Sequence, residues 1–216
     1  MKFKIKQLSQ YQSTRDEAIV ALCRDKKVLH IGATDAPYTK PKLDADLLLH
    51  AKIDKVAEDV LGIDIDQEAI DFLKEQGMDN IIAFDMNKLE ALDYTPDVII
   101  FGETIEHLMN QELAITNLKQ IMSQDTKLVV STPNALWLNK VIDTLLQTEH
   151  QHPDHKVVFS LATLKNLFEA NDMVVKEMYY TFLNRKRTGI TKKLKKAFCK
   201  MFPGFSETLL FVVRKS

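Results

Sequence analysis

The feature that most constrains this chain is a series of short apolar segments that alternate with amphipathic, helix-like segments. The apolar segments are rich in Val, Ile and Leu and cover residues 27–31, 60–63, 80–84, 97–101, 127–132, 173–182 and 207–214. They do not clearly alternate between apolar and polar residues, which is typical of strands buried on both faces of a parallel sheet. We therefore predict a doubly wound α/β fold, with a seven-stranded, mostly parallel sheet covered by helices on both faces.

Signals for helix ends support this alternation. Residues 67–76 follow Asp66, which is suited to an N-cap, and precede Gly77, a residue type that ends many helices. Ser160 is similarly placed to cap a helix over residues 161–170. These signals predict that the two segments are helices that lie against the sheet.

The C-terminal third departs from simple strand–helix alternation. Residues 135–148 carry an apolar stripe at helical spacing, so we predict a helix there. No ordinary crossover helix separates the segments 173–182 and 207–214. We therefore predict that the last strand is antiparallel, within one domain that spans residues 1–216.

Composition and charge narrow the class of protein. The chain has 216 residues, 45% hydrophobic content and a formal net charge of -1, which suits one globular domain and does not indicate a polyanion-binding protein. Cys23 and Cys199 match neither a metal-ligand spacing nor a disulfide framework, as expected in a reducing cytosol. Residues 1–6 lack the apolar run of a signal peptide, and no apolar stretch approaches the roughly 20 residues of a membrane span. We expect a cytoplasmic protein.

The ends of successive strand segments carry residue types that suit a nucleotide. Gly32 permits a tight turn and a close approach of the backbone to a ligand. Asp64 can accept hydrogen bonds from both hydroxyls of a ribose, and Asp85 can accept one from an adenine amino group while Met86 packs on the ring. The predicted cofactor-binding residues are Gly32, Ala33, Thr34, Asp64, Ile65, Asp85, Met86 and Gly102.

These strand ends resemble those of the class I S-adenosylmethionine (SAM)-dependent methyltransferases over nearly the whole chain. Segment 97–108 is very similar to the fourth motif of that family, and segment 131–134 resembles the stretch after its fifth strand. The resemblance implies a Rossmann-like fold with a closing antiparallel pair and SAM as the cofactor. It also implies that Asp64 is the ribose ligand and that Asp85 lies on the adenine side.

The chain departs from the family pattern in its first loop. Thr34 and Ala36 stand where the family usually has glycines. The stretch between the first two strand ends is also longer than the roughly 20 residues of the ordinary fingerprint. We predict that the extra length holds an inserted helix at about 43–58, which covers the ligand. With the His-Pro-Asp-His of 152–155, this insert resembles methyltransferases of bacterial surface-glycan biosynthesis.

A cluster of acidic residues and histidines follows the fourth strand segment. The spacing of Glu103, Glu106 and His107 predicts that they share one side of a helical turn. His155 belongs to a second histidine-rich segment, 150–155. Two carboxylates and two imidazoles could hold Mg²⁺ or Mn²⁺. The pattern resembles the small-RNA 2′-O-methyltransferases, which implies a metal that grips a ribose diol, with His155 as the second histidine ligand.

The same residues permit a mechanism without a metal. An imidazole titrates near neutral pH, so His107 or His155 could be the general base on an acceptor hydroxyl. In the wider superfamily, a Glu-His pair such as Glu106 and His107 also orients loops. The predicted catalytic residues are Glu103, His107 and His155, and both the metal and the metal-free interpretations stay open.

Positive charge is concentrated in the segment 185–202. Eight Lys and Arg residues and no acidic residue lie between Arg185 and Lys200, beside an apolar stripe at helical spacing. This amphipathic pattern could contact an anionic membrane surface, or the phosphates of a lipid-linked glycan or of RNA. The alternative is a solvated helix that covers its own sheet. We expect the membrane to be a peripheral contact, and we do not expect nucleic acid to be the partner.

The function we predict is O-methylation of a hydroxyl, on a sugar or glycan or on another small molecule. A rival interpretation is a nicotinamide-dependent oxidoreductase, although that class expects a fuller Gly-x-Gly-x-x-Gly. A third is a non-catalytic scaffold with the same fold in a glycan-assembly complex, which the loss of loop glycines favours.

Overall fold

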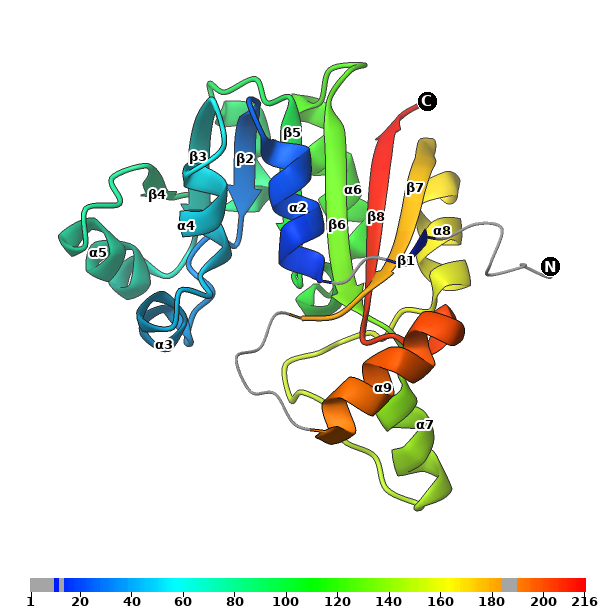
Figure 1. Ribbon diagram of the computed structural model, residues 1–216. Helices are drawn as coiled ribbons and strands as arrows, with labels where there is room; N and C mark the ends of the chain where they lie inside the picture. Colours follow the sequence, from blue (N-terminus) through cyan, green and yellow to red (C-terminus); the bar gives the residue numbers. More distant parts are fainter. Residues whose placement is uncertain (1–9, 12–13, 184–189) are drawn as a thin grey trace.

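The computed structural model describes residues 10–11, 14–183 and 190–216. Within these residues a single sheet has the strand order β1-β7-β8-β6-β5-β2-β3-β4 (Figure 1). The strands are β1 (Gln10–Tyr11), β2 (Lys27–Ile31), β3 (Asp59–Asp64), β4 (Ile81–Ala83), β5 (Val98–Gly102), β6 (Lys127–Pro133), β7 (Met173–Thr181) and β8 (Thr208–Lys215). Strand β8 pairs antiparallel with β6 and β7, and the other pairings are parallel. The predicted seven-stranded sheet is therefore confirmed, and the two-residue β1 extends its edge.

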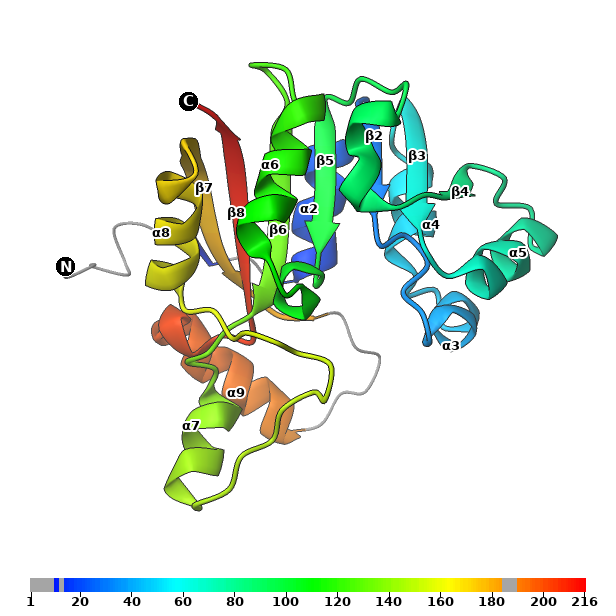
Figure 2. The same ribbon diagram turned by 180° about the vertical axis from the view of Figure 1, so that it is seen from behind.

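Helices cover both faces of the sheet, as predicted. The helices are α2 (Arg15–Cys23), α3 (Thr39–Asp44), α4 (Leu49–Asp54), α5 (Gln67–Glu75), α6 (Gln111–Ile121), α7 (Leu138–Leu145), α8 (Leu161–Ala170) and α9 (Ile190–Met201). Short 3-10 turns are η1 (Met86–Ala91), η2 (Ile105–His107) and η3 (Pro203–Phe205). Helices α2 and α4 lie on the face seen in Figure 1, and α6 and α8 lie on the face seen in Figure 2.

Two hydrophobic clusters explain why both faces are covered. Successive residues of the strands point to opposite faces, so Val28 belongs to a cluster with residues of α2 and α4, while Leu29 belongs to a cluster that includes residues of α6 and α8. Ile19 and Ile53 complete the first cluster, and Phe168 belongs to the second; all three are fully buried. A strand that is buried on both faces has a continuous run of apolar residues, which explains the apolar segments in the sequence.

The predicted helix caps are present. Asp66 accepts a hydrogen bond from the backbone of Ala69 at 2.9 Å, and Ser160 forms a reciprocal capping box with Thr163. Gly77 follows α5 with a φ of 84°, the left-handed conformation that a glycine adopts readily. The helix predicted over 161–170 has the observed bounds of α8.

The insert between β2 and β3 differs from the prediction. One helix was expected at about 43–58, and the structure has two short ones, α3 and α4. The break comes at Asp46, whose φ of 56° turns the chain so that Leu48 is buried beside Ile70 and Leu73. Burial of Leu48 against α5 therefore outweighs continuation of the helix.

The helix predicted over 135–148 is also shorter, since α7 covers Leu138–Leu145. It begins late because the backbone N–H groups of Leu136 and Trp137 donate to the side chain and the carbonyl of Asn134.

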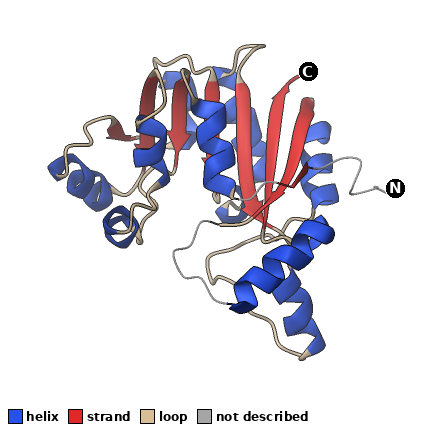
Figure 3. Cartoon of the chain, viewed as in Figure 1, coloured by secondary structure: helices blue, strands red, loops and turns tan. Residues whose placement is uncertain are grey.

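Helices α7 and α9 lie beyond the carboxyl end of the parallel strands, where they form a wall separate from the sheet (Figure 3). No helix in the described part of the chain combines the length and the apolar character needed to cross a bilayer.

Candidate active site

A cavity of about 1220 Å³ opens at the carboxyl ends of β2, β3 and β5. This is the edge where ligands bind in doubly wound sheets. Gly32, Asp64 and Gly102 line it from the strand ends, and Tyr38 and Trp137 line it from the insert and from the start of α7. The volume exceeds the usual range of small-molecule sites, which leaves room for a cofactor and an acceptor together.

Gly32 is required by the geometry of the first loop. Its φ is 74°, and an added Cβ would lie 3.2 Å from the hydroxyl oxygen of Thr104. Its backbone N–H donates to the carbonyl of Ile63 at 2.9 Å, which ties the loop to the end of β3. A side chain here would therefore be strained and would crowd the turn after β5.

Asp64 has both carboxylate oxygens in hydrogen bonds. Oδ2 accepts from the backbone N–H and the hydroxyl of Thr34, at 3.0 and 2.7 Å. Oδ1 accepts from the backbone N–H groups of Ile65 and Asp66, at 2.8 and 3.2 Å. The Thr34 that replaces a family glycine thus helps to hold the carboxylate at the edge of the cavity.

The other predicted cofactor residues lie at different depths. Ala33 and Thr34 are fully buried behind the cavity wall, whereas Ile65 beside Asp64 is 79% exposed. Asp85 and Met86 do not belong to the residues that line the cavity. Asp85 instead accepts hydrogen bonds from the backbone and the side-chain amide of Asn87, both at 2.9 Å, at the start of η1.

Arg15, at the start of α2, is a cavity residue that the sequence reasoning missed. It is 6% exposed and pairs with Asp16 at 3.0 Å and with Glu103 at 3.7 Å. Burial acts to lower the pKa of Arg15, but the charges of Glu103, Asp16 and Asp35 outweigh it and raise that pKa. No sequence pattern joins Arg15 to Glu103, because only the packing of α2 on the sheet brings them together.

The two glutamates do not lie on one side of a helical turn, so the predicted arrangement is wrong. Glu103 has a φ of 51°, and only Ile105–His107 forms a turn of 3-10 helix. Glu103 faces Arg15, and Glu106 is 1% exposed and accepts from the Thr132 hydroxyl at 3.0 Å. Burial, and then the charge of Glu103, raises the pKa of Glu106 to about 8.

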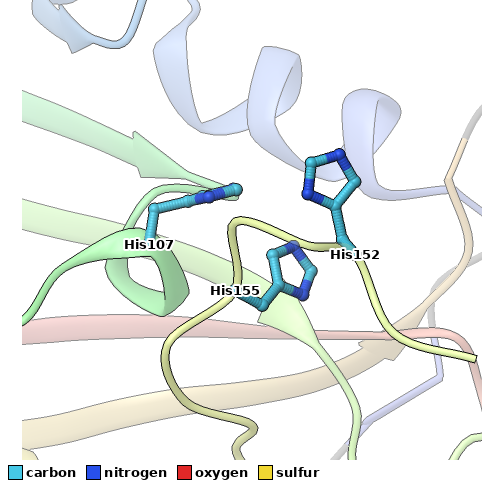
Figure 4. Close-up of side chains that lie close together, drawn as sticks. All are labelled: His107, His152 and His155. Carbon is cyan, nitrogen blue, oxygen red and sulfur yellow. The ribbon is translucent and has the colours of Figure 1, made fainter.

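Three histidines come together beside these glutamates (Figure 4). His107 at the end of η2 lies against His152 and His155, which belong to the loop between α7 and α8. One ring nitrogen from each lies within 4.8 Å of the others, and this is the group of possible metal ligands found among the described residues. The predicted pair His107 and His155 is therefore juxtaposed, Glu103 and Glu106 are not part of the group, and His152 takes their place.

His107 and His155 are held as neutral bases. Burial, followed by the charges of His107 and His152, lowers the pKa of His155 to about 4. Burial also lowers the pKa of His107. At neutral pH both imidazoles therefore carry a lone pair that can accept a proton or bind a cation.

Comparison with known protein families identifies the family of this chain. A family model described as a methyltransferase domain matches residues 12–177. The chain therefore belongs to the methyltransferase domain family, and it is a SAM-dependent methyltransferase. No curated protein matches the chain in sequence.

Solved structures show the same fold at low sequence identity. A SAM-dependent methyltransferase from Archaeoglobus fulgidus is 17% identical, with a TM-score of 0.56 and coverage of 93% of this chain and 94% of that one. One from Aquifex aeolicus is 14% identical, with a TM-score of 0.59 and coverage of 93% and 90%. Magnesium protoporphyrin IX methyltransferase from Synechocystis PCC 6803, solved with bound SAH (S-adenosylhomocysteine), is 12% identical, with a TM-score of 0.56 and coverage of 93% and 82%.

Proposed function

We propose that this enzyme transfers the methyl group of SAM to a hydroxyl of a sugar, a glycan or another small molecule, with His107 as the general base. The observation that carries the proposal is the position of neutral His107 on the wall of the same cavity as Gly32 and Asp64. A cofactor site and a proton acceptor thus face one space that has room for both substrates.

The cofactor is assigned to the side of the cavity formed by β2 and β3. Its ribose would lie at Asp64, where a ribose hydroxyl would have to share Oδ2 with Thr34 or displace the Thr34 hydroxyl. Exposed Ile65 would pack on the adenine, with Asp85 and Met86 further along the same edge. Gly32 would allow the backbone to approach the cofactor closely.

The chemistry needs alignment and one proton acceptor. The acceptor oxygen attacks the methyl carbon, the bond from sulfur to that carbon breaks, and a new bond from oxygen to carbon forms. The hydroxyl proton passes to the ring nitrogen of His107, and S-adenosylhomocysteine leaves. The sulfonium already activates the methyl group, so the protein supplies orientation and the base.

The walls opposite the cofactor suit an acceptor that carries many hydroxyls. Asn139, Lys140, Asp143 and Gln151 offer donors and acceptors of hydrogen bonds, and Trp137 offers an apolar face. A few directional polar groups around an apolar surface are typical of sites that select a polar small molecule. This composition supports a sugar-like acceptor.

We also propose that the wall formed by α7 and α9 contacts an anionic membrane surface. Leu145 and Leu146 are 77% and 68% exposed, and Leu194 and Met201 are 66% and 62% exposed. Lys195 follows Leu194 on α9, is exposed, donates to Asn139 Oδ1 of α7 at 2.7 Å and also lines the cavity. Residues 185–187 of the basic segment lie outside the described residues. Exposed apolar groups next to cations favour an interface with anionic lipid, which would suit a lipid-linked acceptor.

The test of the proposed reaction is transfer of labelled methyl from SAM to a panel of free sugars, sugar nucleotides and lipid-linked sugars. We expect product only with hydroxyl acceptors, and a loss of at least 100-fold in kcat in His107→Gln, the range for removal of a general base. The control is Glu149→Gln, because Glu149 lies on the same loop, is exposed and does not line the cavity. Methylation of amines or thiols alone, or full activity of His107→Gln, would contradict the proposal.

A further inference from the structure

The three histidines reach one point from two separate segments of the chain. The ring centroids of His107 and His155 are 4.7 Å apart, those of His152 and His155 are 5.0 Å apart, and those of His107 and His152 are 5.8 Å apart. All three line the cavity, and Figure 4 shows the rings gathered around a common space. Among the described residues the clustered ligand atoms are these three imidazoles, and the Asp154 carboxylate lies outside the cluster, 3.8 Å from His152 Nδ1.

The histidine loop is attached to the residue directly before His107. The backbone N–H groups of Lys156 and Val157 donate to the carbonyl of Glu106, at 2.8 and 3.3 Å. Within the loop, the N–H of His155 donates to the carbonyl of His152 at 3.1 Å. These bonds fix the loop beside η2, so much of the ordering that a shared ligand would require is already present without it.

The donor set selects a particular kind of ligand. Imidazole nitrogen suits Zn²⁺, Ni²⁺, Co²⁺ and Cu²⁺, whereas Mg²⁺ and Mn²⁺ prefer carboxylate, carbonyl and water oxygens. Three histidines with one position open to a cleft are a known arrangement for Zn²⁺. The oxygen-seeking ions expected from Glu103 and Glu106 therefore do not fit the ligands that the fold brings together.

We propose that His107, His152 and His155 form a binding site for a transition-metal dication of the Zn²⁺ type, with one coordination position open to the cavity. In a tetrahedral Zn²⁺ site the ligand nitrogens lie about 3.4 Å apart, from bonds of about 2.0–2.1 Å. Nitrogens within 4.8 Å reach that spacing by rotation of the side chains. His152 is exposed, and its Nδ1 accepts a hydrogen bond from the backbone N–H of Asp154 at 3.3 Å, which leaves Nε2 for the ion. A His107 nitrogen that binds a cation cannot also accept a proton, so the general-base role proposed above applies to the chain without the ion.

The test is calorimetric titration of the full chain, freed of metal with a chelator, against ZnCl₂ and, separately, MgCl₂. We expect one Zn²⁺ per chain and no detectable heat from Mg²⁺. His152→Gln should weaken Zn²⁺ binding at least tenfold. His150→Gln should leave it unchanged, because His150 is not part of the cluster and its Nδ1 contacts Asp143 at 3.2 Å. Cobalt substitution should give the intense visible absorption of a tetrahedral site in the wild-type chain and in His150→Gln, and not in His152→Gln.

Three results would overturn the inference: no Zn²⁺ binding by the wild-type chain, equal losses in His152→Gln and His150→Gln, or full binding by a variant in which all three histidines are glutamine. Circular dichroism of each variant establishes that it is folded. The readout is metal binding, so failure here leaves the methyl-transfer proposal standing, and failure of methyl transfer leaves the metal site standing.

Discussion

Thr34 donates two hydrogen bonds to Asp64 Oδ2, from its hydroxyl at 2.7 Å and from its backbone N–H at 3.0 Å. A residue that replaces a loop glycine thus occupies one oxygen of the carboxylate assigned to the ribose. If Asp64 binds the ribose as proposed, this departure from the family loop should affect the affinity for the cofactor.

We expect Thr34→Val to strengthen binding of S-adenosylhomocysteine. The exchange keeps the shape of a fully buried side chain and removes the hydroxyl that competes for Asp64 Oδ2. A net hydrogen bond of about 0.5–1.5 kcal/mol corresponds to a gain of roughly 2- to 10-fold in affinity. Thr34→Ser keeps the hydroxyl and is the control. Weaker binding by Thr34→Val, measured by calorimetry, would contradict competition at this oxygen.

Arg15 should be important for stability as well as for the site. Arg15→Met leaves the buried carboxylates of Asp16 and Glu103 without their shared partner, although Lys52 still contacts Asp16 at 2.8 Å. Removal of one partner from a buried ion pair costs about 3–5 kcal/mol. Urea unfolding followed by circular dichroism measures the loss. A loss below about 1 kcal/mol would show that the pairs are weaker than their burial indicates.

Stability should fall when the pH drops below about 6.5, the ordinary pKa of histidine. His30 and His50 are buried and share a hydrogen bond of 3.3 Å between their Nδ1 atoms. Burial, and then the charge of His50, holds the pKa of His30 well below its ordinary value. Because the unfolded chain binds the proton more readily, this stability is present above pH 6.5 and is lost as the pH falls toward the pKa of the folded state.

The predicted slope is up to about 1.4 kcal/mol per pH unit for each proton taken up on unfolding. His30→Asn keeps a side-chain amide near the Nδ1 position but cannot titrate, so its stability should fall less between pH 7.5 and pH 5.5. Urea unfolding at the two pH values compares it with the wild-type chain. Equal losses in both proteins would show that His30 does not contribute to the pH dependence.

The strands and most helix ends could be predicted from the sequence because each depends on local chemistry. The apolar run of β2 and the Ser160 cap of α8 are examples. The break at Asp46 could not, because it depends on the burial of Leu48 against α5. In the site, Glu103 was misplaced because helical spacing was assumed where its φ is 51°.

The site also contains residues that only tertiary structure identifies. His152 belongs with His107 because the loop before α8 hydrogen-bonds to the backbone of Glu106. Arg15 belongs with Glu103 because α2 packs over the sheet. Both contacts join segments that are distant in sequence, so no spacing in the sequence indicates them.

The wall formed by α7 and α9 should bind vesicles that contain phosphatidylserine more tightly than vesicles of phosphatidylcholine alone, and salt should weaken that binding. The double variant Leu194→Ser, Met201→Ser removes exposed apolar groups of α9 and should reduce the bound fraction. Leu113→Ser is the control, because Leu113 is 48% exposed on α6, on another part of the molecule. Equal sedimentation with both kinds of vesicle, or binding to RNA instead, would contradict a membrane contact.

The most direct test of the account is the affinity of wild-type protein and Asp64→Asn for S-adenosylhomocysteine. Trp137 is the single tryptophan of the chain and lines the cavity, so its fluorescence reports binding. We predict saturable binding by the wild-type chain, no response to NAD, and binding by Asp64→Asn that is weaker by about 1.5–3 kcal/mol, the range for hydrogen bonds to a charged group. Asp66→Asn, which can still cap α5, should bind like the wild type. Unchanged affinity in a folded Asp64→Asn, or a response to NAD in place of S-adenosylhomocysteine, would contradict the assignment of this cavity to SAM.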